Sequence, residues 1–220
     1  MNRALVLQLA RFGDLVQSKR LLLSLRASGA EVHLCLDESL AGLARRVYPY
    51  AVLHPICAHG TGLAGKSAPE QAVALLGRNL GAFRELTTLA PDAVYNLNFS
   101  PLNFRVAALF APEIVRGHRW TGGQEVVGPW ARLAMRWSGM RRLGVNIADF
   151  WAWHHPSPVA ANEVNPAAQG RGGGLGVVMA GRESRRSLPP PVLAGLLGAL
   201  RGKLGATKVT LIGTAAEDKA

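Results

Sequence analysis

The sequence is poor in acidic residues, in cysteine and in long apolar runs. Its 220 residues include 14 Asp and Glu against 25 Lys and Arg, a formal net charge of +11, and two cysteines. No apolar run reaches the ~18 residues that a membrane-spanning helix needs. The short run Ala4–Ala10 leads directly into Arg11 without the small-residue cleavage site of a signal peptide. Cys35 and Cys57 stand in apolar, strand-like contexts, which predicts reduced, buried thiols in a cytoplasmic protein.

The remaining composition is that of a folded protein with a basic surface. Hydrophobic residues make up 49% and charged residues 18%, which excludes disorder as the main state. A sequence pI near 10.8 suggests nucleic acid as a partner. The chain nevertheless has no Lys-rich tail, zinc pattern or recognition-helix signature. An anionic membrane surface or a phosphorylated ligand fits the charge equally well, and we predict no nucleic-acid partner.

Apolar runs and helical patterns alternate along most of the chain. Strands are expected over residues 4–9, 31–36, 51–56 and 92–97, with a short one at 114–115. Helices are expected from Asp14 past Leu25 and over residues 38–47, 69–89, 102–109 and 127–143. This alternation predicts an α/β fold with a doubly wound, Rossmann-like sheet.

A change of character follows residue 155. Residues 156–174 are rich in Pro, Ala, Asn and Gly, which predicts a linker between a first domain, 1–155, and a second, 175–220. The second domain is expected to hold strands at 175–179 and 208–212 around a helix at 189–204. Because a βαβ unit of this size cannot bury both faces of its sheet, we expect that domain to be incomplete.

The first predicted strand runs into Arg11, Phe12, Gly13 and Asp14. Gly13 would let the backbone turn tightly at the carboxyl end of the strand, where open α/β sheets place ligands. There, Asp14 could take a proton from an incoming hydroxyl, and Arg11 and Gly13 would line the acceptor or phosphate side. Alternatively, Asp14 only caps the following helix from the N-cap position.

A second phosphate-binding candidate is the segment 60–67, GTGLAGKS. It matches the P-loop pattern, with Lys66 for phosphates and Ser67 for magnesium. Three residues separate it from the preceding strand, however, and Pro69 delays the helix that Lys66 and Ser67 should open. A Gly-rich surface loop is the alternative that we favour.

Two loops of the second domain could hold a nucleotide sugar. Gly181 is followed by an arginine-rich loop that includes Arg185 and Arg186, which could clamp phosphate bidentately or simply be a solvated basic loop. Gly213 leads a second strand-to-helix turn, in which Glu217 could bind ribose hydroxyls or open a helix. We predict no metal site: His154 and His155 would point in opposite directions in an extended segment.

The combined pattern resembles glycosyltransferase family 9, the ADP-heptose:lipopolysaccharide heptosyltransferases. The similarity rests on the segments ALVLQLARFGDLVQSKRLLLSLRASGAEVHLCL, VVMAGRESRRSLPPPVLAGLLGAL and VTLIGTAAE. It implies a GT-B fold in which the first domain holds the acceptor and the second the nucleotide sugar. By position, Asp14 would be the general base, Arg186 would meet the donor phosphate, and Glu217 would hold the ribose.

The resemblance implies inverting, metal-independent sugar transfer in lipopolysaccharide biosynthesis. It implies no cofactor, an ADP-heptose-like donor as substrate, and a lipid-linked or phosphorylated saccharide acceptor. The enzyme would be cytoplasmic, with peripheral contact to the anionic inner face of the membrane. Three positions depart from the family pattern: Arg20 replaces a proline, Arg186 a lysine and Leu188 a tryptophan. A P-loop nucleotide-binding protein or kinase, and a non-catalytic saccharide-binding module, remain the alternatives.

Overall fold

The computed structural model describes residues 2–59, 63, 65–138, 146–164, 174–178, 188–205 and 208–212. Contacts divide the chain into two units, residues 1–166 and 167–220. Each unit is described by itself. The described helices include none that is both long enough and apolar enough to cross a membrane.

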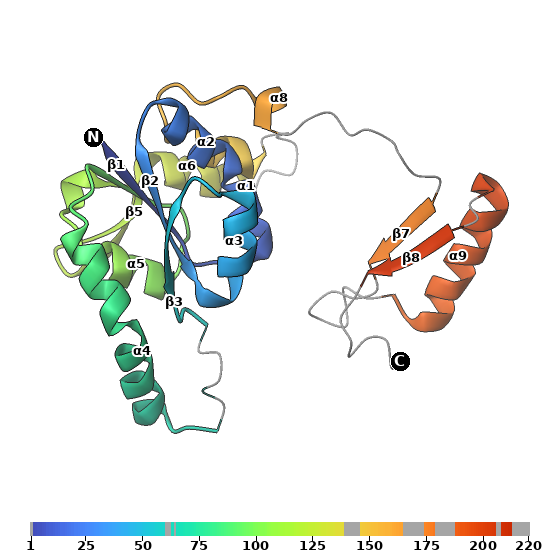
Figure 1. Ribbon diagram of the computed structural model, residues 1–220, viewed down its shortest axis with the longest axis horizontal. Coiled ribbons are helices and arrows are strands. Elements are labelled where there is room, and N and C mark those ends of the chain that lie inside the picture. Colours follow the sequence, from blue (N-terminus) through green and yellow to red (C-terminus); the bar gives the residue numbers. More distant parts are fainter. Residues whose placement is uncertain are drawn as a thin grey trace. The chain divides into compact units, whose positions relative to one another are not determined.

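The first unit is built on a six-stranded sheet in the order β3-β2-β1-β4-β5-β6 (Figure 1). All neighbouring pairs are parallel except β5 and β6, which form an antiparallel hairpin. The strands are β1 (Arg3–Gln8), β2 (Glu31–Asp37), β3 (Val52–Ile56), β4 (Ala93–Asn96), β5 (Val115–Thr121) and β6 (Gln124–Val127). The helices are α1 (Phe12–Gln17), α2 (Lys19–Ala27), α3 (Ala41–Val47), α4 (Ala68–Thr88), α5 (Pro101–Ala107), α6 (Pro129–Ser138), α7 (Ile147–Ala152) and α8 (Ala161–Val164), with 3-10 turns η1 (Glu38–Leu40) and η2 (Pro112–Ile114).

Helices cover both faces of this sheet. Successive side chains of β1 point to opposite faces, and both sets are apolar and buried. Ala4 and Val6 pack into a core with side chains of α1, α2, α3 and α7. Leu5 and Leu7 point the other way, into a core with side chains of α4 and α5. A strand buried on both faces reads as a continuous apolar run, which is why the sequence reveals it. The predicted doubly wound α/β sheet is therefore confirmed.

The strand order reverses beside β1. The chain proceeds outward from β1 through β2 to β3 and then returns to place β4 on the other side of β1. In open α/β sheets, ligands bind outside the carboxyl ends of the strands at such a switch point. The loop that follows β1 starts at this point and leads through Arg11 into the first turn of α1, which contains Gly13 and Asp14.

Several predicted elements need correction. The helix expected past Leu25 is two helices, α1 and α2, which meet at Ser18. Residues 124–127 form strand β6. The helix predicted over 127–143 therefore starts two residues later, at Pro129, as α6. Residues 139–143 of that prediction lie outside the described part. The predicted linker 156–174 contains helix α8, which belongs to the first unit.

The hairpin of β5 and β6 replaces the two-residue strand predicted at 114–115. Its turn residues Gly122 and Gly123 have φ of +58° and +76°, the left-handed conformation that tight hairpins need. Within β5, Gly117 has φ of +89°. Val115 packs in the α5-side core, and His118 also contacts Phe104 of α5. In a regular strand residues three apart point to opposite faces, so the left-handed conformation of Gly117 interrupts the alternation of β5.

The described part of the second unit is a parallel pair of strands and one helix. Strands β7 (Gly174–Val178) and β8 (Lys208–Ile212) pair directly, and helix α9 (Pro190–Leu204) connects them. Helix α9 ends at Gly205, whose φ of +60° is a left-handed cap. The predicted β-α-β order is confirmed, whereas the acceptor and donor roles given to the two domains stay predictions.

Candidate functional site

Asp14 lies in the first turn of α1, directly after the carboxyl end of β1. The N-cap of this helix is Arg11, so Asp14 occupies the third helical position and not the predicted N-cap. Its Oδ2 accepts a hydrogen bond from the Arg11 N–H at 3.3 Å, which closes the first turn. Capping and a substrate-facing role are therefore compatible here, because the carboxylate is only half-buried.

Gly13 does not make the tight turn that the sequence predicts. It lies inside α1 and is not among the glycines with positive φ, so no special backbone conformation requires it. A Cβ built at Gly13 would meet nothing within 4 Å. The position next to Asp14 is therefore open, and Arg11 and Phe12 before it are exposed.

Two buried polar side chains fix the position of α1. Gln8, at the end of β1, donates from Nε2 to the Asp14 carbonyl at 3.1 Å. The Tyr48 hydroxyl donates to the Leu15 carbonyl. Burial raises the pKa of Tyr48, which keeps this donor protonated. These hydrogen bonds fix the backbone carbonyls of Asp14 and Leu15, and the Asp14 carboxylate stays half-buried at the switch point.

The neighbouring carboxylate at the end of β2 has a structural task. Asp37 is buried and accepts hydrogen bonds from the backbone N–H of Ser39, Ala58 and His59 at 3.1, 2.9 and 3.2 Å. Burial alone would raise the pKa of Asp37, but the hydrogen bonds from Ser39 and Ala58 outweigh it and lower the pKa. Asp37 is thus an ionised anchor for the segment that follows β3.

A buried network of amide side chains lies on the β4 side of the switch point. Asn96, the last residue of β4, donates from Nδ2 to the His118 carbonyl at 2.8 Å and accepts from Asn103 at 3.0 Å. Ser100 caps α5 and donates to the Asn103 Oδ1 at 2.8 Å. The network ties β4, α5 and β5 together at the carboxyl end of β4.

The P-loop candidate is used differently from the motif. Ser67 is the N-cap of α4 and donates from its hydroxyl and its backbone N–H to Glu70 Oε2, at 2.6 and 2.8 Å. The helix opens at Ala68, after Lys66 and Ser67, whereas in a P-loop these two residues begin the helix. Residues 60–62 and 64 lie outside the described part. The described residues therefore favour a capped surface loop.

The predicted donor-binding residues cannot be placed against the site. Gly181, Arg185, Arg186, Gly213 and Glu217 all lie outside the described residues. The strands that precede them, β7 and β8, are described and run parallel. Their roles stay predictions that rest on sequence alone.

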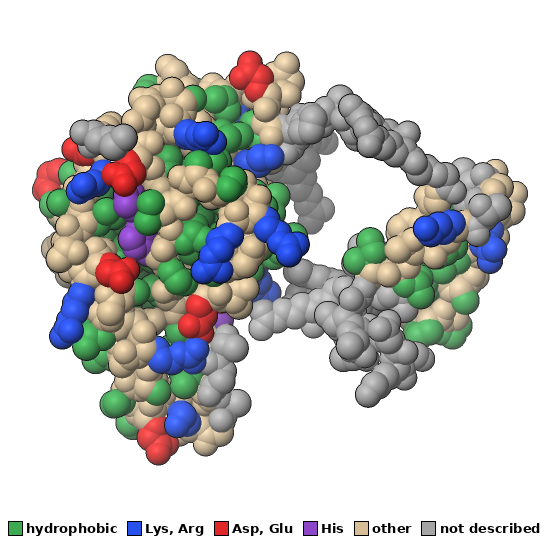
Figure 2. Space-filling view, in the orientation of Figure 1, with side chains coloured by type: hydrophobic (Ala, Val, Ile, Leu, Met, Phe, Trp, Pro, Cys, Tyr) green, Lys and Arg blue, Asp and Glu red, His purple; other side chains and the backbone are tan. Residues whose placement is uncertain are grey.

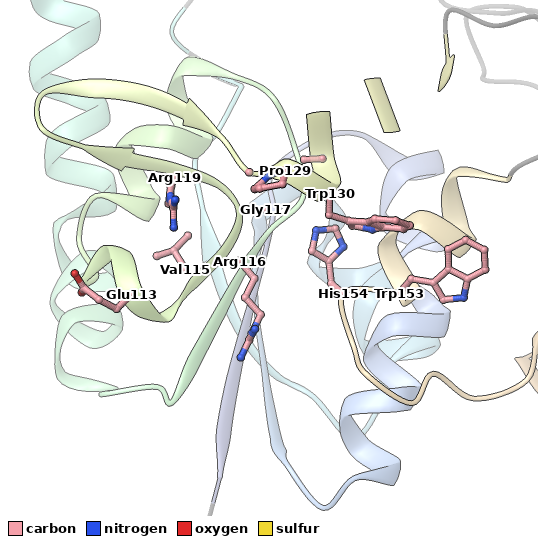
Figure 3. A pocket seen from close by; sticks show the side chains of 11 residues that line it. Glu113, Val115, Arg116, Gly117, Arg119, Pro129, Trp130, Trp153 and His154 are labelled. Carbon is pink, nitrogen blue, oxygen red and sulfur yellow. The ribbon is translucent and has the colours of Figure 1, made fainter. Parts of the chain in front are cut away.

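The structure also contains a cavity that the sequence did not predict. It has a volume of about 360 Å³ and lies between β5, the start of α6 and the residues after α7 (Figure 3). Arg116, Arg119, Trp130, Trp153 and His154 contribute to its walls. The one available signal was the pair of arginines flanking a glycine in residues 116–119.

The two cysteines are free and buried, as the sequence predicted, and burial raises the pKa of Cys35 to about 12.

The fold described above is similar to the folds of solved heptosyltransferase and family 9 glycosyltransferase structures. Similar solved structures include E. coli heptosyltransferase WaaC with ADP (16% identity, TM-score 0.60), the same enzyme with ADP-2-deoxy-2-fluoro heptose (15%, 0.57), and a family 9 glycosyl transferase from Veillonella parvula DSM 2008 (12%, 0.57). Each match covers 99% of this chain and, respectively, 70%, 71% and 64% of the solved chain. No protein-family model and no curated protein matches the sequence.

Proposed function

We propose that this protein is a heptosyltransferase-like glycosyltransferase that uses Asp14 as its general base. The observation that carries the proposal is the position of Asp14 at the switch point of the sheet, where its backbone carbonyl accepts from Gln8 and its carboxylate accepts from the Arg11 N–H. The solved WaaC structures hold ADP and an ADP-heptose analogue, which supports a nucleotide sugar as donor.

The proposed reaction inverts the anomeric centre. The acceptor hydroxyl gives its proton to Asp14 while its oxygen attacks the anomeric carbon. The bond from that carbon to the donor phosphate breaks, and the nucleoside diphosphate leaves with the electron pair. Arg185 and Arg186 would neutralise the leaving diphosphate, a task that guanidinium groups perform by bidentate hydrogen bonds and that requires no metal ion.

The test is Asp14→Asn, assayed by release of ADP from ADP-heptose with a lipopolysaccharide-type acceptor. Asparagine keeps an oxygen that can accept from the Arg11 N–H, so we expect the melting temperature to change little. It cannot take a proton, so we expect turnover to fall about 10²–10⁴-fold. Glu125→Gln, an exposed change on β6, is the matched control. Near-normal turnover of Asp14→Asn would mean that Asp14 only caps helix α1 and is not the general base.

A binding module without catalysis predicts a different result. Such a protein would bind the saccharide acceptor but would show no heat of binding with ADP, UDP or GDP sugars in calorimetry. We propose binding of an ADP sugar, with Gly181, Gly213 and Glu217 among its ligands. Glu217→Gln should weaken it about tenfold if its carboxylate accepts from the ribose hydroxyls.

We also propose a cytoplasmic location with peripheral contact to an anionic membrane, where a lipid-linked acceptor would be found. The net charge of +11 supports this contact. On the face shown in Figure 2, Lys and Arg side chains are scattered over the first unit with acidic side chains between them. Cosedimentation with vesicles containing phosphatidylglycerol should therefore be weak and should disappear at high salt. Equal sedimentation with neutral vesicles would contradict an electrostatic contact.

A further inference from the structure

Helix α4 carries apolar side chains on two opposite faces. One face packs on the sheet, where Leu86 is fully buried and Phe83 packs against the same core. The other face carries Val73, Leu76 and Leu80, which are 73%, 60% and 42% exposed. A helix on a protein surface ordinarily turns polar and charged residues away from the core. A second, exposed apolar face therefore indicates a surface that contacts a partner.

The exposed face begins on a part of α4 that projects from the first unit. Arg78 forms an ion pair with Glu38, which directly follows the carboxyl end of β2. The residues of α4 before Arg78 extend past this end of the sheet (Figure 1), and the projecting part shows apolar side chains at its surface (Figure 2). Val73 and Leu76 belong to this projecting part, which the sheet does not cover.

Five residues spaced alternately three and four apart follow one line along the exposed face. They are Glu70, Val73, Gly77, Leu80 and Arg84. Two packed helices contact each other through residues at this spacing. The line has a carboxylate at one end, a guanidinium at the other and uncharged residues between them.

The midpoint of this line is Gly77. A Cβ built at Gly77 would meet nothing within 4 Å, so the packing of the described residues does not require glycine there. Glycine inside a helix is less stable than alanine, but it lets another backbone approach closely. A helix crossing at Gly77 would use that close approach.

The charges on the line indicate which partner fits. Glu70 and Arg84 lie about two helical turns on either side of Gly77. Where two copies of α4 cross antiparallel at Gly77, each Glu70 lies beside the Arg84 of the other copy. Both side chains are exposed, so they are accessible for this pairing. An anionic lipid surface fits less well, because it would repel Glu70 and the line has no excess of positive charge.

We propose that the exposed face of α4 is the contact surface of a homodimer in which two copies of the helix cross antiparallel at Gly77. Val73 and Leu80 of each copy pack against the other copy, and two Glu70–Arg84 ion pairs flank them. One helix pair is a small interface, so the dissociation constant should be about 1–100 μM. The proposal rests on α4 and not on sugar transfer.

The first test is sedimentation equilibrium of the full chain at concentrations below, within and above that range. We expect the mass to rise from 23.4 kDa toward twice this value. Val73→Lys should weaken association at least about tenfold, because the dimer would bury two added ammonium groups. Val192→Lys is the matched control: it makes the same change at an exposed valine of α9 and should have no effect.

The second test exchanges the charges. Glu70→Arg and Arg84→Glu should each weaken association about fivefold, because like charges would meet twice in the dimer. The double variant Glu70→Arg, Arg84→Glu should recover the affinity of the wild type to within about twofold, since it restores both pairs. A thermal melt of each variant checks that the loss of the Ser67–Glu70 hydrogen bonds does not unfold the chain.

The third test fixes the crossing point. The two native cysteines are buried, so Gly77→Cys supplies an exposed thiol on the two-fold axis. Mild oxidation should convert this variant to a covalent dimer on a non-reducing gel. Gly42→Cys, at an exposed glycine of α3 with equally open surroundings, should stay monomeric on that gel.

Four results would overturn the proposal. These are a mass that stays at 23.4 kDa at every concentration, equal weakening by Val73→Lys and Val192→Lys, no recovery in the charge-exchanged double variant, and equal crosslinking of Gly77→Cys and Gly42→Cys. A monomeric chain whose cosedimentation with neutral vesicles is abolished by Val73→Lys would assign the face to lipid instead. Asp14→Asn should dimerise like the wild type, so loss of transfer and loss of association are measured separately.

Discussion

At the scale of single residues, Arg20 explains one departure from the family pattern. The resemblance places a proline at this position. Arg20 instead donates from Nε to the Val159 carbonyl at 2.8 Å and forms an ion pair with Asp149. Its side chain is only 13% exposed. A residue on α2 thereby holds α7 and the segment before α8, a task that proline could not perform.

We expect Arg20→Ala to lower the free energy of unfolding by about 2 kcal/mol, because charge-assisted hydrogen bonds are lost and Asp149 keeps a partly buried charge. Urea unfolding followed by circular dichroism measures the change. Arg45→Ala, an exposed change on α3, should cost less than about 0.5 kcal/mol. If both variants cost the same, the Arg20 contacts do not contribute.

A second residue-scale feature is the histidine pair of β2 and β3. His33 Nδ1 and His54 Nε2 are 2.9 Å apart, and the rings stack with centroids 5.2 Å apart. Glu31 and Glu85 lie 3.6 and 3.7 Å from the outer ring nitrogens. Burial lowers the pKa of both histidines, and the two carboxylates only partly oppose it. The pair is therefore stable with both rings neutral.

This arrangement predicts a loss of stability in mild acid. The folded-state pKa values lie below the ordinary histidine value of about 6.5, so the unfolded chain takes up more protons as the pH falls. Stability is complete above that value and decreases below it. The melting temperature should be lower at pH 5 than at pH 7.5, and the double variant His33→Gln, His54→Gln should lose part of this dependence. His118, whose pKa burial lowers to about 4, should account for some of the rest.

At the scale of elements, the β5–β6 hairpin is the element that differs most from the sequence prediction, and its strand β5 lines the cavity. Its residues 115–127 are largely polar and show no apolar alternation, which is why the strand pattern was missed. Gly122 and Gly123 were the available signal, since a two-residue Gly-Gly turn between strand-forming residues indicates a hairpin. The periodic helices and the buried strands were predicted because their patterns repeat over many residues.

We expect Gly117→Ala to cost at least about 3 kcal/mol of unfolding free energy. Its φ of +89° is strained for alanine, and the added methyl would overlap the Asn96 carbonyl. Gly81→Ala is the matched control: Gly81 lies in helix α4 with nothing within 4 Å of a built Cβ. That change should stabilise by about 0.5–1 kcal/mol. A small cost at Gly117 would mean that the left-handed conformation is not required there.

At the scale of the whole molecule, the two identified core clusters both lie in the first unit. Their members range from Ala4 to Trp151 and fill both sides of the six-stranded sheet. In the described part of the second unit, α9 and β8 leave apolar side chains such as Val192, Leu196 and Leu211 about half exposed. Among the described residues, most of the buried apolar side chains therefore belong to the first unit.

We expect a chain of residues 1–166 to unfold cooperatively within about 3 °C of the melting temperature of the full chain's main transition. It should lose binding of an ADP sugar, because the predicted donor residues are absent. A fall of more than about 8 °C would show that the second unit contributes to the stability of the first.

The sequence by itself determined the alternating strands and helices, the two buried thiols and the Asp14 carboxylate after the first strand. These features follow from local rules, namely the periodicity of burial and the turn that ends a strand. Only the tertiary structure decided that β1 borders the switch point, that Asp14 is the third residue of α1, and that Arg119 and His154 share one cavity. Those facts depend on contacts between residues far apart in the chain, such as Gly117 with Gly128 and Asn96 with His118. Local periodicity cannot predict such contacts, because the packing of the whole core determines which segments meet.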